Sequence, residues 1–412
     1  MATSHSYDGA AAPPFRMGVL LAIAALSACT SNASTPQIPV STSEAATMQH
    51  ITVPLHDGKA RGRPHDLPFT VVATGLENPR GMDLGPDGRL YVAEGGLGGS
   101  RSTTSDQCQQ VPAPIGPYTG GFTSRVSAID VTTGALTTIV ENLPSNQTNA
   151  ASGGFVSGVA DVKFLHGKLY ALIAGAGCSH GLVGTFNSID RIDRGGIAMP
   201  IVNLSQFIMN NPVVNPNPPD FEPDGTWYSM VAVGNTLYAV EPNHGEVDVI
   251  SPGRGCKDSR ISRLVDVSAT QGHIVPTALT FFDGQFLLGN LNTFVPGSQG
   301  NAKVFRLTMR GNLTKISSGL TAVTGVVAHH GRIYALEAFT GFYAPAPPVA
   351  NSGTVVRLEH NGTWTQIVTG LSFPTAMTFG ANNTLYISNK GFGQPTNTSG
   401  EIVKVHVSNT QD

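Results

Sequence analysis

Charged residues are scarce in this 412-residue chain: only 12% are Asp, Glu, Lys or Arg, and the formal net charge is -3. The 24 Lys and Arg residues form no basic stripe, so no nucleic-acid partner is expected, because binding to phosphates requires one. The sequence also lacks a Gly-x-Ser-x-Gly elbow, a His-Glu-x-x-His pair, a phosphate loop and a Cys-x-x-Cys pair. An enzyme built on this sequence would have to use side chains that the fold brings together.

Gly, Pro, Ser, Thr and Asn are abundant, which suits an all-β protein with many turns. The stretch 79–94 reads as an apolar strand, a Pro-Asp-Gly turn and a second strand, the pattern of a β-hairpin. Five related hairpins follow, at 162–173, 230–241, 279–290, 326–337 and 377–389. Six irregular copies of a four-strand unit predict an all-β fold, a six-bladed β-propeller that occupies residues 67–408 as one domain.

The last copy has only three strands before the C-terminus. Residues 69–76 resemble the outer strand of the fifth copy at 365–371, and a proline follows each of them. We therefore expect this N-terminal strand to complete the sixth blade, closing the ring and removing its open sheet edges.

Residues 1–29 resemble a lipoprotein-type signal peptide. An apolar run over 17–25, too short to span a membrane, leads into Leu-Ser-Ala-Cys and ends at Cys29, the predicted lipidation site. Residues 30–66 would then form a flexible tether. The sequence predicts an exported, monomeric cell-envelope protein, periplasmic or on the outer surface, that touches the membrane only through its lipid. The alternative is an ordinary secretory signal with a chance cysteine and a secreted protein.

If Cys29 carries a lipid, three cysteines remain, enough for one disulfide in an exported protein. The order of the predicted strands places Cys108 and Cys178 in loops of neighbouring blades on one face of the ring. Cys256 falls in a turn on the opposite face. A Cys108–Cys178 disulfide is therefore predicted, which would fix the longest loop over the mouth of the channel.

Nearly all insertions fall in connections that emerge on one face, here called the top face; the short hairpin turns emerge on the opposite, bottom face. The long top-face connections are 95–124, 143–158, 175–187, 205–227 and 338–353. Long loops gathered on one face of a rigid scaffold are where binding usually occurs.

The second strand of most hairpins ends on a carboxylate or carboxamide at the top face. These residues are Glu94, Glu241, Asn290, Glu337 and Asn389, with Ile173 at the sixth position. A ring of oxygen ligands around the channel would suit one divalent cation such as calcium, the only cofactor considered, or a polyhydroxylated ligand. The alternative is that each side chain binds the backbone of a neighbouring blade.

Six further side chains are candidates for the ligand site at the channel mouth. Each histidine could be a general base, a metal ligand or simply a residue that fixes its loop. A carboxylate facing the channel is costly unless it is paired or liganded, so the aspartate is either functional or a buried hydrogen-bonding strut. The six are Arg80, Asp161, His180, Tyr228, His244 and His273.

Five longer blocks carry a family resemblance beyond the hairpins. They are Asn-Pro-Arg-Gly at 78–81, Ser-Gly-Val-Ala-Asp-Val at 157–162, Gly-Ala-Gly-Cys-Ser-His-Gly at 175–181, Glu-Pro-Asp-Gly-Thr-Trp-Tyr-Ser-Met-Val at 222–231 and Glu-Pro-Asn-His-Gly at 241–245. With them the chain resembles the ScyD/ScyE family over about 68–405. The resemblance implies an exported propeller related to NHL-repeat proteins, in a family whose biochemical activity is not established.

Two functions fit these observations. The first is a binding module whose top face holds a small-molecule or protein ligand at the channel mouth. The second is a divalent-metal-dependent lactonase or esterase-like hydrolase resembling the gluconolactonase-type propellers, in which a cation polarises the substrate carbonyl. Binding is preferred, because the sequence identifies no ordered acid–base pair.

Overall fold

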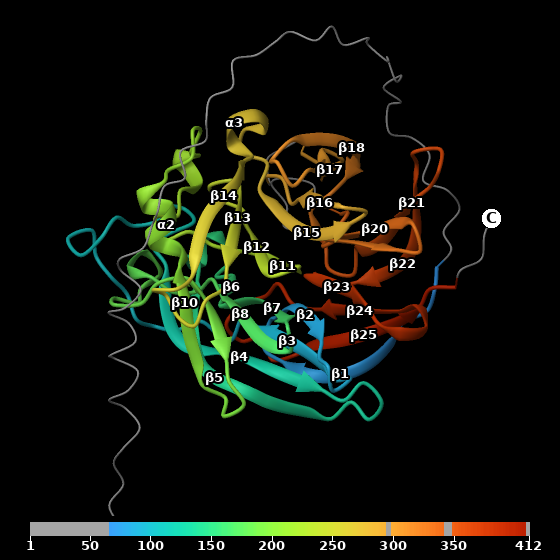
Figure 1. Ribbon diagram of the computed structural model, residues 1–412, viewed down its shortest axis with the longest axis horizontal. Coiled ribbons are helices and arrows are strands. Elements are labelled where there is room, and N and C mark those ends of the chain that lie inside the picture. The colour runs from blue at the N-terminus through green and yellow to red at the C-terminus, as the bar shows by residue number, and fades with distance from the viewer. Residues whose placement is uncertain (1–65, 294–297, 342–347, 409–412) are drawn as a thin grey trace, which may run out of the picture.

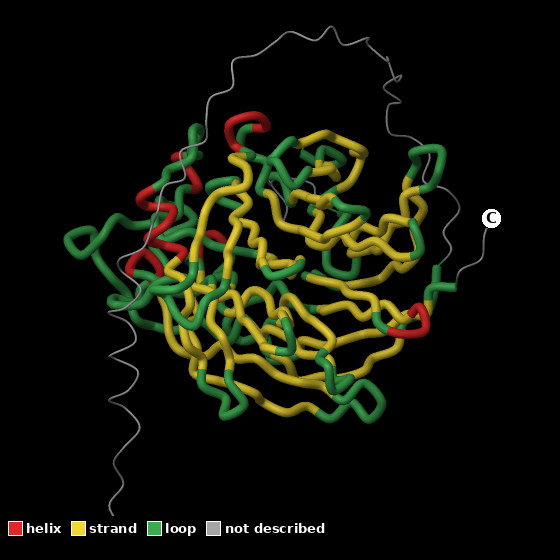
Figure 2. The backbone as a smooth tube through the Cα atoms, viewed as in Figure 1, coloured by secondary structure: helices red, strands yellow, loops and turns green. Residues whose placement is uncertain are grey.

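Six antiparallel sheets surround a central axis in the computed structural model, which describes residues 66–293, 298–341 and 348–408 (Figure 1). The predicted six-bladed β-propeller is confirmed. Strand dominates the ring, and helix occurs only in short pieces such as α2 (Leu204–Asn210) and α3 (Ser268–Gln271), which lie in top-face connections (Figure 2). No helix among the described residues has the length and apolar character needed to cross a membrane.

Each blade numbers its strands outward from the channel. Blade one contains β2 (Pro79–Leu84), β3 (Leu90–Glu94), β4 (Thr119–Ile129), β5 (Leu136–Gln147) and the short β6 (Val156–Ser157). Blade two contains β7 (Val159–Leu165), β8 (Lys168–Ile173), β9 (Ser188–Ile192) and β10 (Ala198–Asn203). Blade three contains β11 (Ser229–Val233), β12 (Thr236–Glu241), β13 (Glu246–Ser251) and β14 (Arg260–Asp266).

The remaining blades follow the same plan. Blade four contains β15 (Pro276–Phe282), β16 (Gln285–Asn290), β17 (Ala302–Leu307) and β18 (Leu313–Leu320). Blade five contains β19 (Val323–His329), β20 (Arg332–Glu337), β21 (Gly353–Leu358) and β22 (Trp364–Leu371). Blade six contains β23 (Ala376–Phe379), β24 (Thr384–Asn389), β25 (Gly400–His406) and β1 (Thr70–Leu76).

The two ends of the propeller meet in blade six. Strand β1 pairs antiparallel with β25, with Thr70 opposite Lys404 and Leu76 opposite Gly400. Figure 1 shows the blue β1 beside the red β25. The predicted closure by the N-terminal strand is therefore confirmed, and the ring is held shut by backbone hydrogen bonds between residues more than 300 positions apart.

Local sequence explains the hairpins. In the first, Gly88 adopts φ +79°, a left-handed conformation that side-chain-bearing residues rarely take, and the Asp87 carboxylate accepts a hydrogen bond from the Arg89 backbone N–H (3.2 Å). Alternation along each strand sends apolar side chains to both sheet faces, where they pack against the neighbouring blades. Successive first strands contact one another around the axis, so their inward side chains line the channel.

The predicted signal peptide, including Cys29, lies outside the described residues, as does the predicted tether up to residue 65.

Candidate functional site

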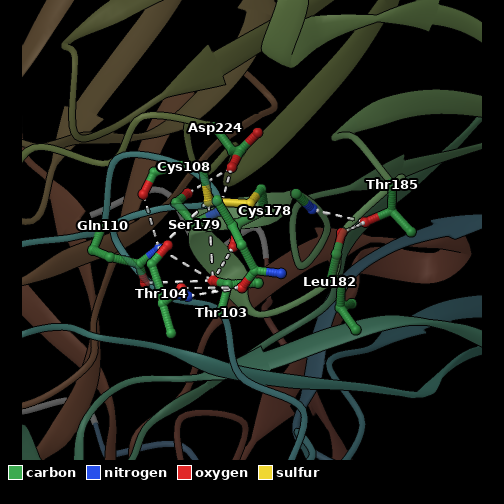
Figure 3. Close-up of a disulfide and its surroundings, with 11 residues drawn as sticks. Thr103, Thr104, Cys108, Gln110, Cys178, Ser179, Leu182, Thr185 and Asp224 are labelled. Carbon is green, nitrogen blue, oxygen red and sulfur yellow. Dashed lines mark hydrogen bonds between the residues drawn. A yellow bond between two sulfur atoms is a disulfide. The ribbon is translucent and has the colours of Figure 1, made fainter.

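A disulfide joins the long top-face loops of blades one and two (Figure 3). Cys108, between β3 and β4, is bonded to Cys178, between β8 and β9, with the two Cα atoms 6.2 Å apart. The Thr103 hydroxyl of the same loop donates a hydrogen bond to the Cys178 carbonyl (2.7 Å). The predicted disulfide is confirmed, and it ties the longest loop of blade one to the neighbouring blade.

The acidic loop at 218–224, from blade three, carries a buried carboxylate that holds three side chains. The Tyr118 hydroxyl donates to Glu222 Oε1 (2.7 Å), the Thr226 hydroxyl donates to Oε2, and His180 Nε2 lies 3.2 Å from Oε2. The other His180 ring nitrogen, Nδ1, lies 2.7 Å from the Ala176 carbonyl. Because both ring nitrogens face oxygen acceptors, the arrangement requires the doubly protonated imidazolium. Burial lowers the pKa of His180, but the hydrogen bond and charge of Glu222 outweigh burial and raise it overall.

The other two candidate histidines contact the same loop. His244 Nε2 lies 2.8 Å from the Glu222 carbonyl, and His273 Nε2 lies 3.1 Å from Asp220 Oδ2. Beside the disulfide, Asp224 Oδ2 accepts hydrogen bonds from the Ser179 backbone N–H (2.7 Å) and hydroxyl (2.6 Å), as Figure 3 shows. The three histidines thus hold the 218–224 loop, and of the roles considered for them this geometry matches the fixing of a loop.

The five carboxylate and carboxamide side chains at the ends of the second strands share one structural role. Each bonds the backbone of the segment that leads into its own blade, 15 to 17 residues earlier. Glu94 accepts from Glu77 N (2.6 Å), Glu241 from Thr226 N (2.8 Å), Glu337 from Thr321 N (2.7 Å) and Asn389 from Ser372 N (2.8 Å), while Asn290 Nδ2 donates to Ile274 O (2.8 Å).

The expected ring of ligands around the channel is therefore not formed. These residues end the second strand of each blade, one strand out from the axis, and their side chains turn toward the leading segment of the same blade. None of the five lines the channel cavity. Across the residues that the structure describes, no three His, Cys, Asp or Glu side chains lie close enough together to hold a metal ion.

Arg80 and Tyr228 close the top of the channel. The buried Arg80 guanidinium donates to the Val156 carbonyl, linking blades one and two. The Tyr228 hydroxyl of blade three donates to the Thr375 carbonyl (3.0 Å) of blade six, on the opposite side of the ring. Burial lowers the pKa of Arg80, an effect opposed by the adjacent Tyr228 hydroxyl, and burial raises the pKa of Tyr228 to about 12. The channel mouth is thus filled by protein side chains.

Beneath this closure, the first strands enclose a cavity of about 110 Å³. Asp161 Oδ1 lies 2.6 Å from Lys163 Nζ, and Oδ2 accepts a hydrogen bond from the Met230 backbone N–H (2.8 Å). Burial raises the pKa of Asp161, and the charge of Lys163 opposes that effect. Asp161 therefore bridges blades two and three as a buried strut. Ligand sites for small molecules usually measure about 300–1,000 Å³, so this cavity is too small for one.

An aromatic pair beside the channel mouth was missed by the sequence analysis. Phe155 and Phe392, both half-buried, stack with ring centroids 4.4 Å apart and an interplanar angle of 17°. The Arg80 guanidinium carbon lies 5.8 Å from the Phe392 centroid, and the Val156 N–H donates to the Gly393 carbonyl (3.1 Å). The available signal was an aromatic residue next to glycine in two top-face loops, where no core surrounds it.

Of the predicted site residues, the structure thus brings Arg80, Asp161 and Tyr228 together at the channel and gathers the three histidines around one loop. The carboxylate and carboxamide side chains stay apart, each in its own blade.

Solved propeller structures share this fold at low sequence identity. An α-L-arabinanase from Penicillium chrysogenum complexed with arabinobiose is 10% identical, with 84% of this chain and 100% of that chain covered and a TM-score of 0.50. The PQQ-bound aldose sugar dehydrogenase from Streptomyces coelicolor is 12% identical (84% and 99% covered, TM-score 0.48). A gluconolactonase from Xanthomonas campestris is 13% identical (85% and 100% covered, TM-score 0.41). No protein-family model and no curated protein matches the sequence. These likenesses concern the fold alone.

Proposed function

We propose that this protein is an exported propeller of the ScyD/ScyE type that binds a small-molecule ligand on its top face, beside the closed channel mouth. The observation that carries the proposal is the stacked pair Phe155–Phe392 next to Arg80, on a face whose loops are held by a disulfide and by buried hydrogen bonds. A surface fixed in this way loses little entropy when a ligand binds.

The chemistry of this surface favours a ligand with one flat apolar face and polar edges, such as a sugar ring or an aromatic compound. Half-buried aromatic rings offer a stacking surface that loses little water. The Nε–H of Arg80 is buried and has no hydrogen-bond partner among the described residues, so a ligand oxygen is a suitable acceptor for it.

The metal-dependent lactonase or esterase is the weaker proposal. Its ligands would have to be Glu94, Glu241, Asn290, Glu337 and Asn389, which the blades use to bind backbone groups. A protein ligand is a further alternative, because a fixed loop surface also suits one.

A thermal-shift and calorimetric screen of the mature protein against sugars, sugar lactones and aromatic compounds tests the proposal. We expect at least one compound to raise the melting temperature, and the rise to be lost in Phe155→Ala and Phe392→Ala. Met309→Ala removes an exposed apolar side chain from a bottom-face turn and serves as the control. Binding that survives in both phenylalanine variants, or lactone turnover that requires a divalent ion, would overturn the proposal.

Export and attachment through a lipid on Cys29 are part of the same proposal. The Cys108–Cys178 disulfide supports export, because disulfides persist in oxidising compartments. Labelling of cells with a clickable fatty acid should mark the wild-type protein and not a Cys29→Ala variant. Equal labelling of both would exclude this anchor.

A further inference from the structure

A larger hollow lies on the bottom face, between blades two and three. Its volume is about 560 Å³, within the usual size of a small-molecule site. Its walls come from the β7–β8 turn, β9, the β11–β12 turn and the β13–β14 turn. We call it the bottom-face groove. It lies at the opposite end of the blades from the aromatic pair.

Three cations border the bottom-face groove. Tyr170 and Arg191 are direct cross-strand partners in blade two, and Lys168 lies two residues before Tyr170, so all three side chains project from one sheet face. That face is turned toward blade three, because Tyr170 packs in the same apolar cluster as Met230. Arg254 approaches from blade three.

The remaining lining leaves this positive charge unbalanced. Asp258 is the only acidic residue of the lining, which leaves an excess of two positive charges. Neither Asp258 nor any of the three cations forms an ion pair with a residue that the structure describes. His166 Nε2 is held 2.6 Å from Asn235 Oδ1, while Leu165 and Pro252 supply apolar surface.

Blade five contains the same arrangement with an acid in place. Arg332, Tyr334 and Arg357 occupy the positions that correspond to Lys168, Tyr170 and Arg191, with Tyr334 again opposite Arg357 in the register. There the Glu359 carboxylate lies 3.0 Å from Arg332 Nη1 and 2.9 Å from Arg357 Nε. The blade thus binds an oxyanion between two cations that flank a tyrosine.

Blade two lacks this internal acid. The residue that corresponds to Glu359 is Asp193, whose Oδ1 accepts hydrogen bonds from the backbone N–H groups of Gly195 (2.8 Å) and Ile197 (3.0 Å). The Asp193 carboxylate therefore stabilises its own turn and forms no ion pair with Lys168 or Arg191. Arg191 remains half-buried beside Tyr170, whose pKa is raised by burial and lowered in part by the Arg191 charge.

We propose that the bottom-face groove binds a small organic anion, whose carboxylate or phosphate group takes the place that the Glu359 carboxylate has in blade five. The two oxygens of such a group match the planar fork of the Arg191 guanidinium, and Lys168 and Arg254 add charge from either side. The tyrosine ring and the apolar wall accommodate the carbon skeleton of the ligand. This site is independent of the one proposed on the top face.

Titration calorimetry of the mature protein at low ionic strength, with glucuronate, citrate, glucose 6-phosphate and inorganic phosphate as probes, tests the proposal. We expect at least one organic anion to bind, and Arg191→Gln to weaken its binding on the order of tenfold to a hundredfold. Added salt should weaken it too, because the groove is open to solvent. Arg194→Gln removes a nearby exposed arginine that does not line the groove and should leave binding unchanged.

Lys168→Glu provides a second variant, which introduces a carboxylate close to Arg191 and should abolish binding while the melting temperature without ligand stays close to the wild-type value. Failure of every probe to bind the wild type, or binding that Arg191→Gln and Lys168→Glu leave intact, would overturn the proposal. Binding of inorganic phosphate with the same affinity as the organic anions would also refute it, since the apolar wall would then contribute nothing. Loss of binding in Phe155→Ala would place the anion on the top face instead.

Discussion

Asp190 should make the propeller less stable as the pH rises through 6. This aspartate in β9 is 8% exposed, and the Ser188 hydroxyl donates a hydrogen bond to its Oδ1 (2.6 Å). Burial raises the pKa of Asp190 from 3.8 to about 6, and Ser188 opposes the shift only in part. Because the pKa is higher in the folded state than in the unfolded state, the native protein holds this proton more tightly. The resulting stabilisation is complete below pH 3.8 and is lost as the pH rises through about 6.

The magnitude follows from the shift. About two pKa units correspond to about 3 kcal/mol of unfolding free energy, the difference between low pH and pH values above 6. Asp190→Asn places a neutral amide at the same position, where its oxygen still accepts from Ser188. The variant should therefore match the wild type near pH 4 and exceed its stability by up to about 3 kcal/mol near pH 8.

Urea unfolding of the wild type and Asp190→Asn at pH values from about 4 to 8 measures this difference. Asp283→Asn is the matched control, because Asp283 is exposed in a hairpin turn with φ +51°, a conformation that asparagine also tolerates. Its stability difference from the wild type should not change with pH. A difference for Asp190→Asn that is equally constant across the range would refute the reasoning, because it would mean that Asp190 is ionised in the folded protein even at the lowest pH.

Three further changes test the fold and the channel closure. Deletion of residues 70–76 should open the ring and lower the melting temperature of the whole domain in calorimetry, and an unchanged melting curve would refute closure by β1. Tyr228→Phe should cost about 1–3 kcal/mol in urea unfolding, because it removes the hydroxyl beside the buried Arg80; an unchanged midpoint would count against the closure. Replacing both Cys108 and Cys178 with serine releases a cross-link of 70 residues and should cost about 4 kcal/mol, whereas a loss close to zero would mean that the buried hydrogen bonds alone hold the top-face loops.

Features that depend on short-range sequence patterns could be predicted. The hairpins were identified because alternation and turn residues act within about a dozen positions; the interval 162–173, for example, corresponds to β7 and β8 at Val159–Ile173. Closure by β1 followed from counting strands, since the last blade lacked one. The disulfide followed from assigning Cys108 and Cys178 to connections on the same face of adjacent blades.

Side-chain direction at the ends of strands could not be predicted. Glu94 was expected at the channel, yet its carboxylate binds the Glu77 backbone N–H, because the course of the leading segment decides which groups lie within reach. In the same way, Phe155 and Phe392 form a pair only because blades one and six adjoin after the ring closes.

The sequence by itself therefore determined the repeat, the blade count, the closing strand and the disulfide, because strand alternation and turn chemistry are local. Only the tertiary structure decided what the polar side chains do. Asp193 and Glu359 occupy corresponding positions, but one bonds its own turn and the other binds two arginines. That difference, which leaves Lys168 and Arg191 unpaired with any described residue beside the groove, depends on distances of a few ångströms between residues that are not adjacent in sequence.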